Sequence, residues 1–390
     1  MRKSYKFRIY PAKAEEAIIQ DTLNTCRILY NDSLSARKDA YEERFECINY
    51  YDQADLLKVQ NKESKWLAAV YSQVLQDVLK RLDKAYQNFF RRVKAGDKPG
   101  YPRFRGYDRY DSFTYPQKGY KIVDNKLVLS KIGTIKIKMH RPIPEEAKIK
   151  TCTVKREANR WFAVFTVELP DSVPEECEIR NTIGLDLGLT SLITTSTGEK
   201  IDNPRWLRTT EKKLAKSQRK LSRNKKGSKN RKKQKLEVQI VHRKIRNQRS
   251  DFLHKVSKKL VDKYDFIAME QLTIKGMMKN RYLAKSISDV GWNQLTSLVA
   301  YKAEGAGKIM ELVNPKGTSQ ECSRCGAVVS KTLAVRTHRC PYCRLVMDRD
   351  ENAAINILNR AMAKVGMGRP EFTPVEILAG VSMKQDAYAL

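Results

Sequence analysis

The stretch CSRCGAVVSKTLAVRTHRCPYCRLVMDRDENAAIN, residues 322–356, joins a cysteine pattern to an acidic one. Its first part holds two Cys-x-x-Cys pairs separated by fourteen residues, Cys322 with Cys325 and Cys340 with Cys343. Two such turns supply the four thiolates of a structural tetrahedral zinc site, so we predict that these cysteines bind one zinc ion. Four buried free cysteines would not need this paired spacing, and a redox dithiol would not need four ligands. We interpret His338 as a spectator, because the four cysteines already close the site.

The second part of the stretch, DRDENAAIN, places acids directly before a helix-forming run. Two further acids lie on predicted strands, Asp186 within the hairpin TIGLDLGLTSLITTSTGEK and Glu270 at the end of KYDFIAMEQL. A carboxylate on a buried strand is costly unless it is paired or holds a metal. We predict that Asp186, Glu270 and Asp350 converge on a pair of Mg²⁺ ions of the kind that hydrolyse phosphodiesters. The order of these elements predicts the mixed sheet and flanking helices of an RNase H-like domain.

The composition points to a polyanionic partner. A chain of 390 residues with a net charge of +32 is far more basic than solubility requires, which favours nucleic acid over a membrane surface. The sequence contains no apolar run of the roughly 20 residues that a membrane span needs. Its first residues, MRKSYKFRIYP, lack the apolar core of a signal peptide, so we expect a cytoplasmic protein. The scattered cysteines are interpreted as reduced core residues: Cys26, Cys47, Cys152 and Cys177.

The first half of the chain predicts a small sheet with helices inserted into it. Residues 3–9 and several runs between 120 and 170 alternate as strands do, which is typical of an antiparallel sheet or a small barrel. Between them, apolar residues recur at helical spacing in two regions, and we interpret them as the core of a helical bundle. They are Ile19, Leu23, Cys26, Tyr30 and Leu34, then Val70, Val74, Val78, Leu82, Tyr86 and Phe89.

Two segments are candidates for nucleic-acid contact. Residues 101–115 mix arginines with aromatic side chains, a combination that pairs with phosphates and stacks on exposed bases, although an ordinary loop packed on a sheet would also fit. Residues 205–262 contain 22 Lys or Arg against 4 acids, and we predict helices with one phosphate-facing side. The predicted contacts are Tyr101, Arg103, Phe104, Arg105, Arg223, Lys225, Lys226, Arg231, Lys232 and Lys233.

Three motifs carry a family resemblance. GLDLGLT with Asp186, IAMEQL with Glu270 and DRDENAAIN with Asp350 resemble the three RuvC motifs of TnpB proteins, the OrfB products of bacterial and archaeal insertion sequences. The likeness covers nearly the whole chain, through AYQNFFRRVK, GYPRFR, DFLHK, ISDVGW and NPKGTSQECSRCG. Within DRD, the D-x-N-A-A pattern implies Asp350 as the metal ligand, and Asp348 is expected to support or cap.

The resemblance implies an RNA-guided DNA endonuclease. Such a protein takes a guide RNA from the transposon end, recognises a short adjacent DNA motif and cleaves DNA that pairs with the guide. Its partners would be that RNA, the target double-stranded DNA and its displaced strand, bound by a monomer. Two alternatives stay open: a guided repressor or transposition regulator without cleavage, and a miniature CRISPR effector. A strand-joining transposase could use the same fold and metals, but the agreement of motifs along the full chain excludes it. All three acids are present, which disfavours the inactive repressor.

The predicted fold class is α+β with several domains. Residues 1–10 and 95–172 are expected to form a wedge β-barrel, and 11–94 a helical recognition lobe inserted into it. Residues 173–318 and 346–365 are expected to form the RuvC-like α/β domain, with the basic helices at 205–262. A four-cysteine zinc ribbon at 319–345 interrupts that domain, and 366–390 is expected to be a mobile tail.

Overall fold

The structure, a computed structural model, describes residues 2–107, 109–170, 177–332 and 334–366. The tail predicted from residue 366 onward therefore lies, beyond Gly366, outside the described residues. The chain divides into two units, one formed by residues 1–172 and 214–244 and the other by 173–213 and 245–390.

The first unit contains a seven-stranded antiparallel sheet. Strand β1 (Arg2–Tyr10) lies inside it, between β7 (Arg160–Glu168) and β5 (Gly133–Lys138), so the first residues of the chain pair with residues more than a hundred positions away. The remaining strands are β2 (Ser112–Tyr115), β3 (Tyr120–Val123), β4 (Lys126–Leu129) and β6 (Lys148–Glu157). The order is β2-β6-β7-β1-β5-β4-β3, which leaves β2 and β3 at opposite edges. Among the described residues, strand pairing therefore gives an open sheet and not a closed barrel.

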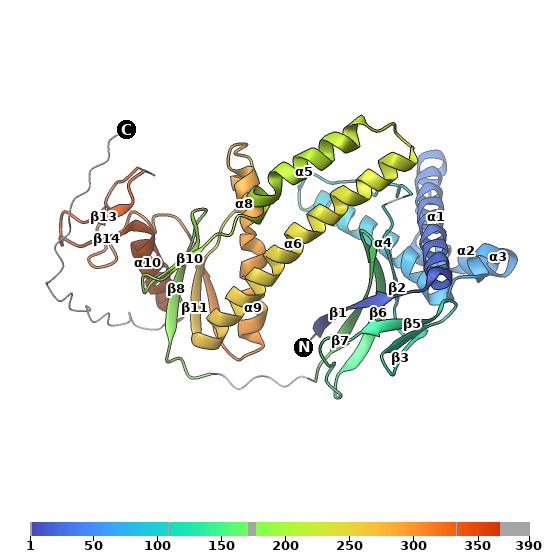
Figure 1. The fold of residues 1–390 in the computed structure, drawn as a ribbon, viewed down its shortest axis with the longest axis horizontal. Coiled ribbons are helices and arrows are strands. Elements are labelled where there is room, and N and C mark those ends of the chain that lie inside the picture. The colour runs from blue at the N-terminus through green and yellow to red at the C-terminus, as the bar shows by residue number, and fades with distance from the viewer. Residues whose placement is uncertain (1, 108, 171–176, 333, 367–390) are drawn as a thin grey trace. The chain divides into compact units, whose positions relative to one another are not determined.

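The helices of this unit lie between β1 and β2 in the chain (Figure 1). They are α1 (Lys13–Arg44), α2 (Tyr50–Glu63), α3 (Lys65–Ala68) and α4 (Ser72–Lys94). The predicted apolar stripe of α1 is buried and shares one core with the sheet. The stripe of α4 is buried only as far as Leu82, because Tyr86 and Phe89 lie half-exposed near its end. Helix α2 was not predicted, although Asn49 and Asp52 form a capping box at its start.

The second unit is built on a five-stranded mixed sheet of order β10-β9-β8-β11-β12. The predicted hairpin is confirmed as the antiparallel pair β8 (Thr182–Leu187) and β9 (Ser191–Thr195), and the short β10 (Lys200–Asp202) extends it. Strand β11 (Phe266–Glu270) runs parallel to β8 on one side and to β12 (Ile309–Val313) on the other. The switch from antiparallel to parallel pairing thus occurs at β8.

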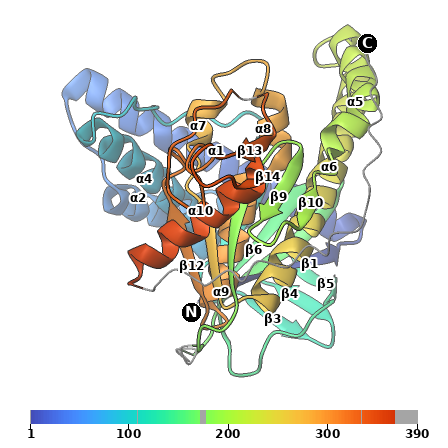
Figure 2. The ribbon, with the colours of Figure 1, turned by 90° about the vertical axis from the view of Figure 1, so that its left-hand side faces the viewer.

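Helices cover both faces of this sheet. Along β11, Phe266 and Ala268 join a core with α10 (Arg349–Lys364), whereas Ile267 and Met269 face the opposite core. That opposite core contains the last turns of α6 (Lys229–Lys263) and α9 (Trp292–Glu304). Figure 2 shows α10 crossing the sheet, on the face opposite to the core with α6 and α9. Successive side chains of β11 therefore pack alternately against the helices on one face of the sheet and those on the other.

The basic region is helical as predicted, and it forms two helices, α5 (Trp206–Arg223) and α6. Asp289 contacts both helices from the end of α8 (Ala284–Val290), in the ISDVGW segment. Its carboxylate accepts from the backbone amide of Leu207 at 3.0 Å and from Arg249 at 2.6 Å. Gly291 follows with φ +76°, and a Cβ there would lie 3.1 Å from Arg249 Cδ. The remaining elements are α7 (Ile274–Met277), β13 (Thr337–Arg339) and β14 (Val346–Asp348).

The four scattered cysteines do not share one environment. Cys26 and Cys152 are buried core residues as predicted, but Cys47 and Cys177 are exposed, so the prediction was wrong for these two. Cys47 follows the end of α1 and Cys177 precedes β8, outside the cores that bury the others. None of the described helices combines the length and the apolar character needed to cross a membrane.

One glycine sets how closely α10 can approach the sheet. A Cβ on Gly184 of β8 would lie 2.0 Å from the carbonyl oxygen of Ala354 and 2.8 Å from Leu358 Cβ. Both contacts belong to α10, and the first is to backbone, which cannot rotate away. Only a residue without a side chain fits at this crossing.

We therefore predict that Gly184→Ala destabilises the second unit by about 2 kcal/mol, since the helix must move away from the strand. Gly276→Ala is the matched control in the same unit, because a Cβ there comes no closer than 3.6 Å to another side chain, and it should not be less stable than the parent. Denaturant unfolding, followed by the fluorescence of Trp292 in a background where Trp66, Trp161 and Trp206 are replaced by Phe, measures both variants. Equal stability of Gly184→Ala and the parent would show that the close approach is not required.

Candidate functional site

The alternation of side chains along the central strands brings two acids to one face. Leu185 and Leu187 of β8 face the α6/α9 core, so Asp186 between them faces α10. Glu270 follows the same rule on β11, two residues beyond Ala268, which packs against α10. Leu185 pairs with Met269, so Asp186 and Glu270 are the next residues along two adjacent parallel strands.

The third acid starts the helix on that face. Asp350 lies in the first turn of α10, and its helix is held against β8 at Gly184. The electrostatic coupling among the acids reflects this convergence, since both Glu270 and Asp350 raise the pKa of Asp186. The three predicted residues are thus brought to one region of one sheet face.

Burial makes two of these acids reluctant to ionise. It is the main reason why the pKa of Asp186 lies well above its usual range, with the neighbouring carboxylates adding to the shift. Burial also raises the pKa of Glu270, although a hydrogen bond from the Thr318 hydroxyl, 2.9 Å away, opposes it. A cation placed between these carboxylates would offset both the cost of burying their charge and their mutual repulsion.

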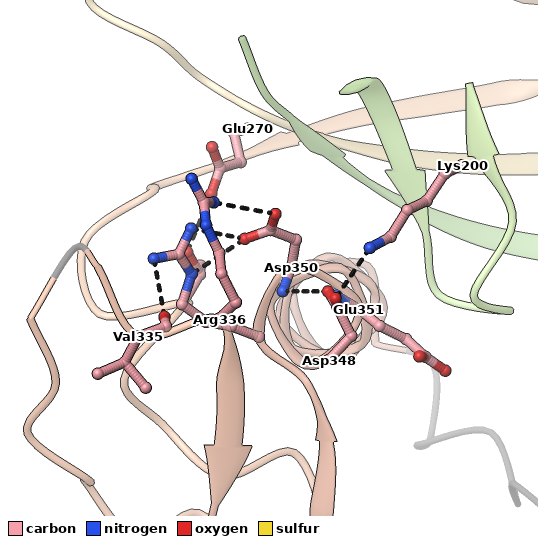
Figure 3. Close-up of polar contacts among 9 residues, drawn as sticks. Lys200, Glu270, Val335, Arg336, Asp348, Asp350 and Glu351 are labelled. Atoms are coloured by element: carbon pink, nitrogen blue, oxygen red, sulfur yellow. Dashed lines mark hydrogen bonds and ion pairs between the residues drawn. The ribbon is translucent and has the colours of Figure 1, made fainter. Parts of the chain in front are cut away.

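Asp350 meets two guanidinium groups (Figure 3). Arg349 donates from Nε and Nη2 to Asp350 Oδ1 at 3.0 and 2.8 Å, and Arg336 Nη1 lies 3.6 Å from Oδ2. With Asp350 held in this way, the three carboxylates do not form a closed ligand set. Across the described ranges, the four cysteines are the group whose ligand atoms lie close enough together to hold one ion. The carboxylate oxygens nevertheless fit Mg²⁺ in chemistry, since it prefers such ligands.

Asp348 has a different role from Asp350. It is the N-cap of α10, accepting from the backbone amides of Asp350 at 2.9 Å and Glu351 at 3.2 Å. Its other oxygen accepts from Lys200 Nζ at 2.8 Å. Burial would raise the pKa of Asp348, but the Lys200 contact and the two amides outweigh it and hold the pKa below its usual value. The expectation that Asp348 caps the helix is confirmed.

The four cysteines form a second site, beside the start of α10. Their sulfur atoms all lie within 4.8 Å of one another, with Cys322 to Cys343 at 3.5 Å and Cys325 to Cys340 at 3.6 Å. Tetrahedral zinc with bonds of about 2.3 Å places its sulfurs roughly 3.8 Å apart, so the cluster fits this ion. His338 is buried beside Lys331 and is not part of the group, in agreement with its interpretation as a spectator.

Two asparagines of α10 connect the cysteine segment to the helix that carries Asp350. The Asn352 side chain accepts from the Ser323 amide at 3.0 Å and donates to the Glu321 carbonyl at 2.7 Å. Asn356, one turn later, donates to the carbonyls of Thr318 and Glu321. The asparagines of the NAAIN segment thus fix the approach to the first cysteine pair on the same helix that carries Asp350.

The predicted nucleic-acid contacts are mostly exposed in the first unit. Exposed residues are Tyr101, Arg103, Phe104, Arg105, Arg223, Lys225, Lys226, Lys232 and Lys233. Arg231 differs, because its Nη1 donates to the carbonyls of Leu221 and Asn224 at 2.7 and 3.0 Å. It closes the turn between α5 and α6, which makes it a structural residue of the hairpin.

Several residues around the acids were not found from the sequence. Arg349 lies between the two aspartates of the DRD segment, so its contact with Asp350 could have been predicted from the sequence. Arg336, Thr318 and Lys200 are separated in sequence from the acids they contact by 14, 48 and 148 residues respectively, and no local pattern marks them.

Three family models match parts of the sequence. A family model described as "Probable transposase" (OrfB_IS605) matches residues 164–281, and a Cas12f1-like TNB domain matches 292–357. A helix-turn-helix model matches residues 1–45, where the structure has strand β1 and the single long helix α1.

Two relatives align with almost the full chain. A predicted RNA-guided DNA endonuclease of Streptomyces pristinaespiralis is 36% identical over 375 residues, 94% of this chain and 91% of the relative. A predicted RNA-guided DNA endonuclease of Escherichia coli (strain K12), InsQ, is 31% identical over 386 residues, 94% of each chain.

Solved structures share the mixed α/β fold. A Cas12f1–sgRNA–target DNA complex gives a TM-score of 0.58 at 14% identity, covering 92% of this chain and 99% of that one. The mini-RNA-guided endonuclease CRISPR-Cas_phi3 gives a TM-score of 0.54 at 8% identity, covering 96% and 94%. At these identities the likeness concerns the fold alone.

We predict that the purified protein contains about one zinc ion per chain and that Cys340→Ser loses it, because three remaining thiolates leave the site open. Elemental analysis by mass spectrometry measures the ratio. Cys47→Ser is the matched control, since Cys47 is exposed and outside the cluster, and it should keep its zinc. Zinc retained in full by Cys340→Ser would contradict the assignment.

Proposed function

The chain belongs to the OrfB/TnpB family, whose curated relatives are named as predicted RNA-guided DNA endonucleases, and from this premise we propose that it cleaves DNA selected by a guide RNA. The observation that carries the proposal is the convergence of Asp186, Glu270 and Asp350 on the α10 face of the mixed sheet. A guided binding protein without cleavage would not need three acids there, two of them with raised pKa values.

The architecture supports an RNase H-like reading of the second unit. The support is a mixed sheet flanked by helices, of order β10-β9-β8-β11-β12, with antiparallel pairing up to β8 and parallel pairing after it. In this proposal residues 173–318 and 346–365 are the RuvC-like domain, and 319–345 is a zinc ribbon inserted before α10. The sheet of β1 to β7 is then the wedge, at 1–10 and 95–172, and 11–94 is the recognition lobe.

The proposed chemistry assigns a role to each acid. Two Mg²⁺ ions held by Asp186, Glu270 and Asp350 would activate a water molecule and stabilise the departing 3′ oxygen of the cleaved strand. Asp186 and Glu270 supply fixed oxygens from adjacent strands, and Thr318 orients the Glu270 carboxylate through its hydroxyl. Asp348 keeps the start of α10 in place, so that Asp350 projects from an ordered first turn. The zinc site has a structural role, since its four cysteines leave no open position.

The proposed partners are a guide RNA, the target double-stranded DNA and its displaced strand, bound by one copy of the chain. The exposed cations of the α5–α6 hairpin and of the loop around Arg103 support this, because guided recognition relies on backbone contacts while base pairing reads the sequence. The family assignment favours a transposon-encoded guide over a CRISPR array, although the fold is shared with Cas12f1.

Replacing Asp186, Glu270 or Asp350 with Ala should lower guided cleavage of DNA by at least ~1000-fold, because each loss removes a ligand of the ions that carry the chemistry. Binding of the same DNA in a gel-shift assay should persist, since the basic surfaces are unchanged.

Asp348→Ala is the matched control within the same segment. It removes a helix cap, worth about 1 kcal/mol, and should lower cleavage far less than Asp350→Ala. If Asp350→Ala cleaves normally and Asp348→Ala does not, the assignment within DRD is reversed. If all three acid variants still cleave, the nuclease proposal fails.

A further inference from the structure

Arg349 begins α10 and folds back onto the carboxylate of the next residue. Its Nε and Nη2 donate to Asp350 Oδ1 at 3.0 and 2.8 Å, and its Nη1 donates to the carbonyl oxygen of Val335 at 3.2 Å. The guanidinium is therefore held from two sides, by the acid on α10 and by the segment between the two cysteine pairs. Its side chain is 14% exposed, so water screens this ion pair less than it screens one on the surface. All of these residues belong to the second unit.

Backbone hydrogen bonds fix the place of Arg349 as well. Its amide donates to the carbonyl of Arg336 at 2.7 Å, and the helix start on which it lies is capped by Asp348. A guanidinium that Val335 already holds loses little further freedom when it pairs with Asp350. The contact is therefore stronger than that of a surface arginine whose side chain rotates freely.

Arg336, the second arginine at this carboxylate, is bound more loosely. Its Nη1 lies 3.6 Å from Asp350 Oδ2, and 60% of its side chain is exposed, so this ion pair contributes little. The charge of Arg349 reaches farther into the site. Burial and the neighbouring carboxylates raise the pKa of Asp186, and Arg349 opposes that rise. Arg349 thus partly neutralises two of the three acids.

A divalent cation and Arg349 need the same oxygen. An ion bound to Asp350 Oδ1 at the Mg²⁺–oxygen distance of about 2.1 Å would lie at most about 5 Å from the two donating nitrogens. Like charges at this separation repel strongly where little water lies between them. The two N–H groups also take the lone pairs with which Oδ1 could bind an ion.

We propose that Arg349 competes with divalent cations for Asp350, so that an ion reaches Oδ1 only when the guanidinium leaves it. The inference rests on the proposed function, because it takes Asp350 as a metal ligand. It adds a residue that lowers the affinity of the site and is not itself a ligand. Val335 still holds Nη1 when the bonds to Asp350 break, so Arg349 stays close and returns when the ion leaves. The acids thereby exchange one positive partner for another and are not left without one.

Binding of Mn²⁺ to the zinc-loaded, full-length protein tests the competition. Mn²⁺ uses the same oxygen ligands as Mg²⁺, and electron paramagnetic resonance counts the free ion. Arg349→Met keeps an unbranched side chain but removes the charge and the donors, and its thioether is a poor ligand for this ion. The variant should bind Mn²⁺ at least about 10-fold more tightly than the parent, because the repulsion and the competing hydrogen bonds are gone. At one Mn²⁺ concentration its melting temperature should also rise more than that of the parent, since tighter binding stabilises the folded state further.

Two matched variants separate competition from other effects. Lys364→Met removes one positive charge from the last turn of the same helix, about 20 Å along the axis from Asp350, and should bind Mn²⁺ within about twofold of the parent. Arg349→Lys retains the charge without the planar fork of donors, so its affinity should lie between those of the parent and Arg349→Met. Zinc content shows whether each variant keeps the folded cysteine segment.

An Mn²⁺ affinity of Arg349→Met equal to that of the parent would overturn the proposal. A lower affinity would also overturn it, because Arg349 would then order Asp350 for the ion, and so would an equal gain in Lys364→Met. If Arg349→Met does not fold, Arg349→Lys carries the test, and binding no tighter than that of the parent would refute the competition.

Failure of the proposed function gives a different result from failure of this inference. If the acids are not a metal site, neither the parent nor Arg349→Met binds Mn²⁺ in a way that depends on Asp186. If the parent binds Mn²⁺ through the acids and Arg349→Met shows no gain, the competition alone is refuted.

Discussion

The contact between Gly184 and the α10 backbone is the constraint on which the candidate site depends. It lets the helix cross β8 with no side chain between them, and the two alanines at 353 and 354 are fully covered there. Two residues along the strand from Gly184 is Asp186, and one turn before Ala354 is Asp350. A wider separation at the crossing would move both acids apart. Gly184 of β8 and the alanines 353 and 354 of α10 therefore belong to the same packing contact.

This close packing creates an electrostatic cost that other side chains offset. Asp186 and Glu270 face the helix layer at low exposure, and burial raises the pKa of each. Thr318 donates to Glu270, Lys200 pairs with Asp348, and Arg349 and Arg336 meet Asp350. Two of these partners, Thr318 and Arg336, come from the segment that carries the cysteines or leads into it. The same segment is anchored to α10 by Asn352 and Asn356, so the zinc site and the acidic face share one helix.

The elements that carry the acids were predictable because each has a local signal. The alternation around Asp186, the short apolar strand ending at Glu270 and the capping aspartate before NAAIN all follow from neighbouring residues. Helix α2 was missed because it buries only Gln53 and Leu57, leaving no apolar stripe to detect. The ion pair between Arg336 and Asp350 could not be predicted, since Arg336 reaches Asp350 only after the cysteine segment has folded beside the helix. The carbonyl partners of Arg231 could not be predicted either, because they belong to a turn whose geometry does not follow from composition.

The central claim is that these carboxylates together bind divalent cations, and Mn²⁺ binding measured by electron paramagnetic resonance tests it most directly. Protons and cations compete for the same oxygens, and the pKa of Asp186 is raised, so the affinity of the zinc-loaded protein for Mn²⁺ should increase as the pH rises. Asp186→Asn should bind Mn²⁺ much more weakly and lose most of this pH dependence. An affinity that is independent of pH and unchanged in Asp186→Asn would contradict the account.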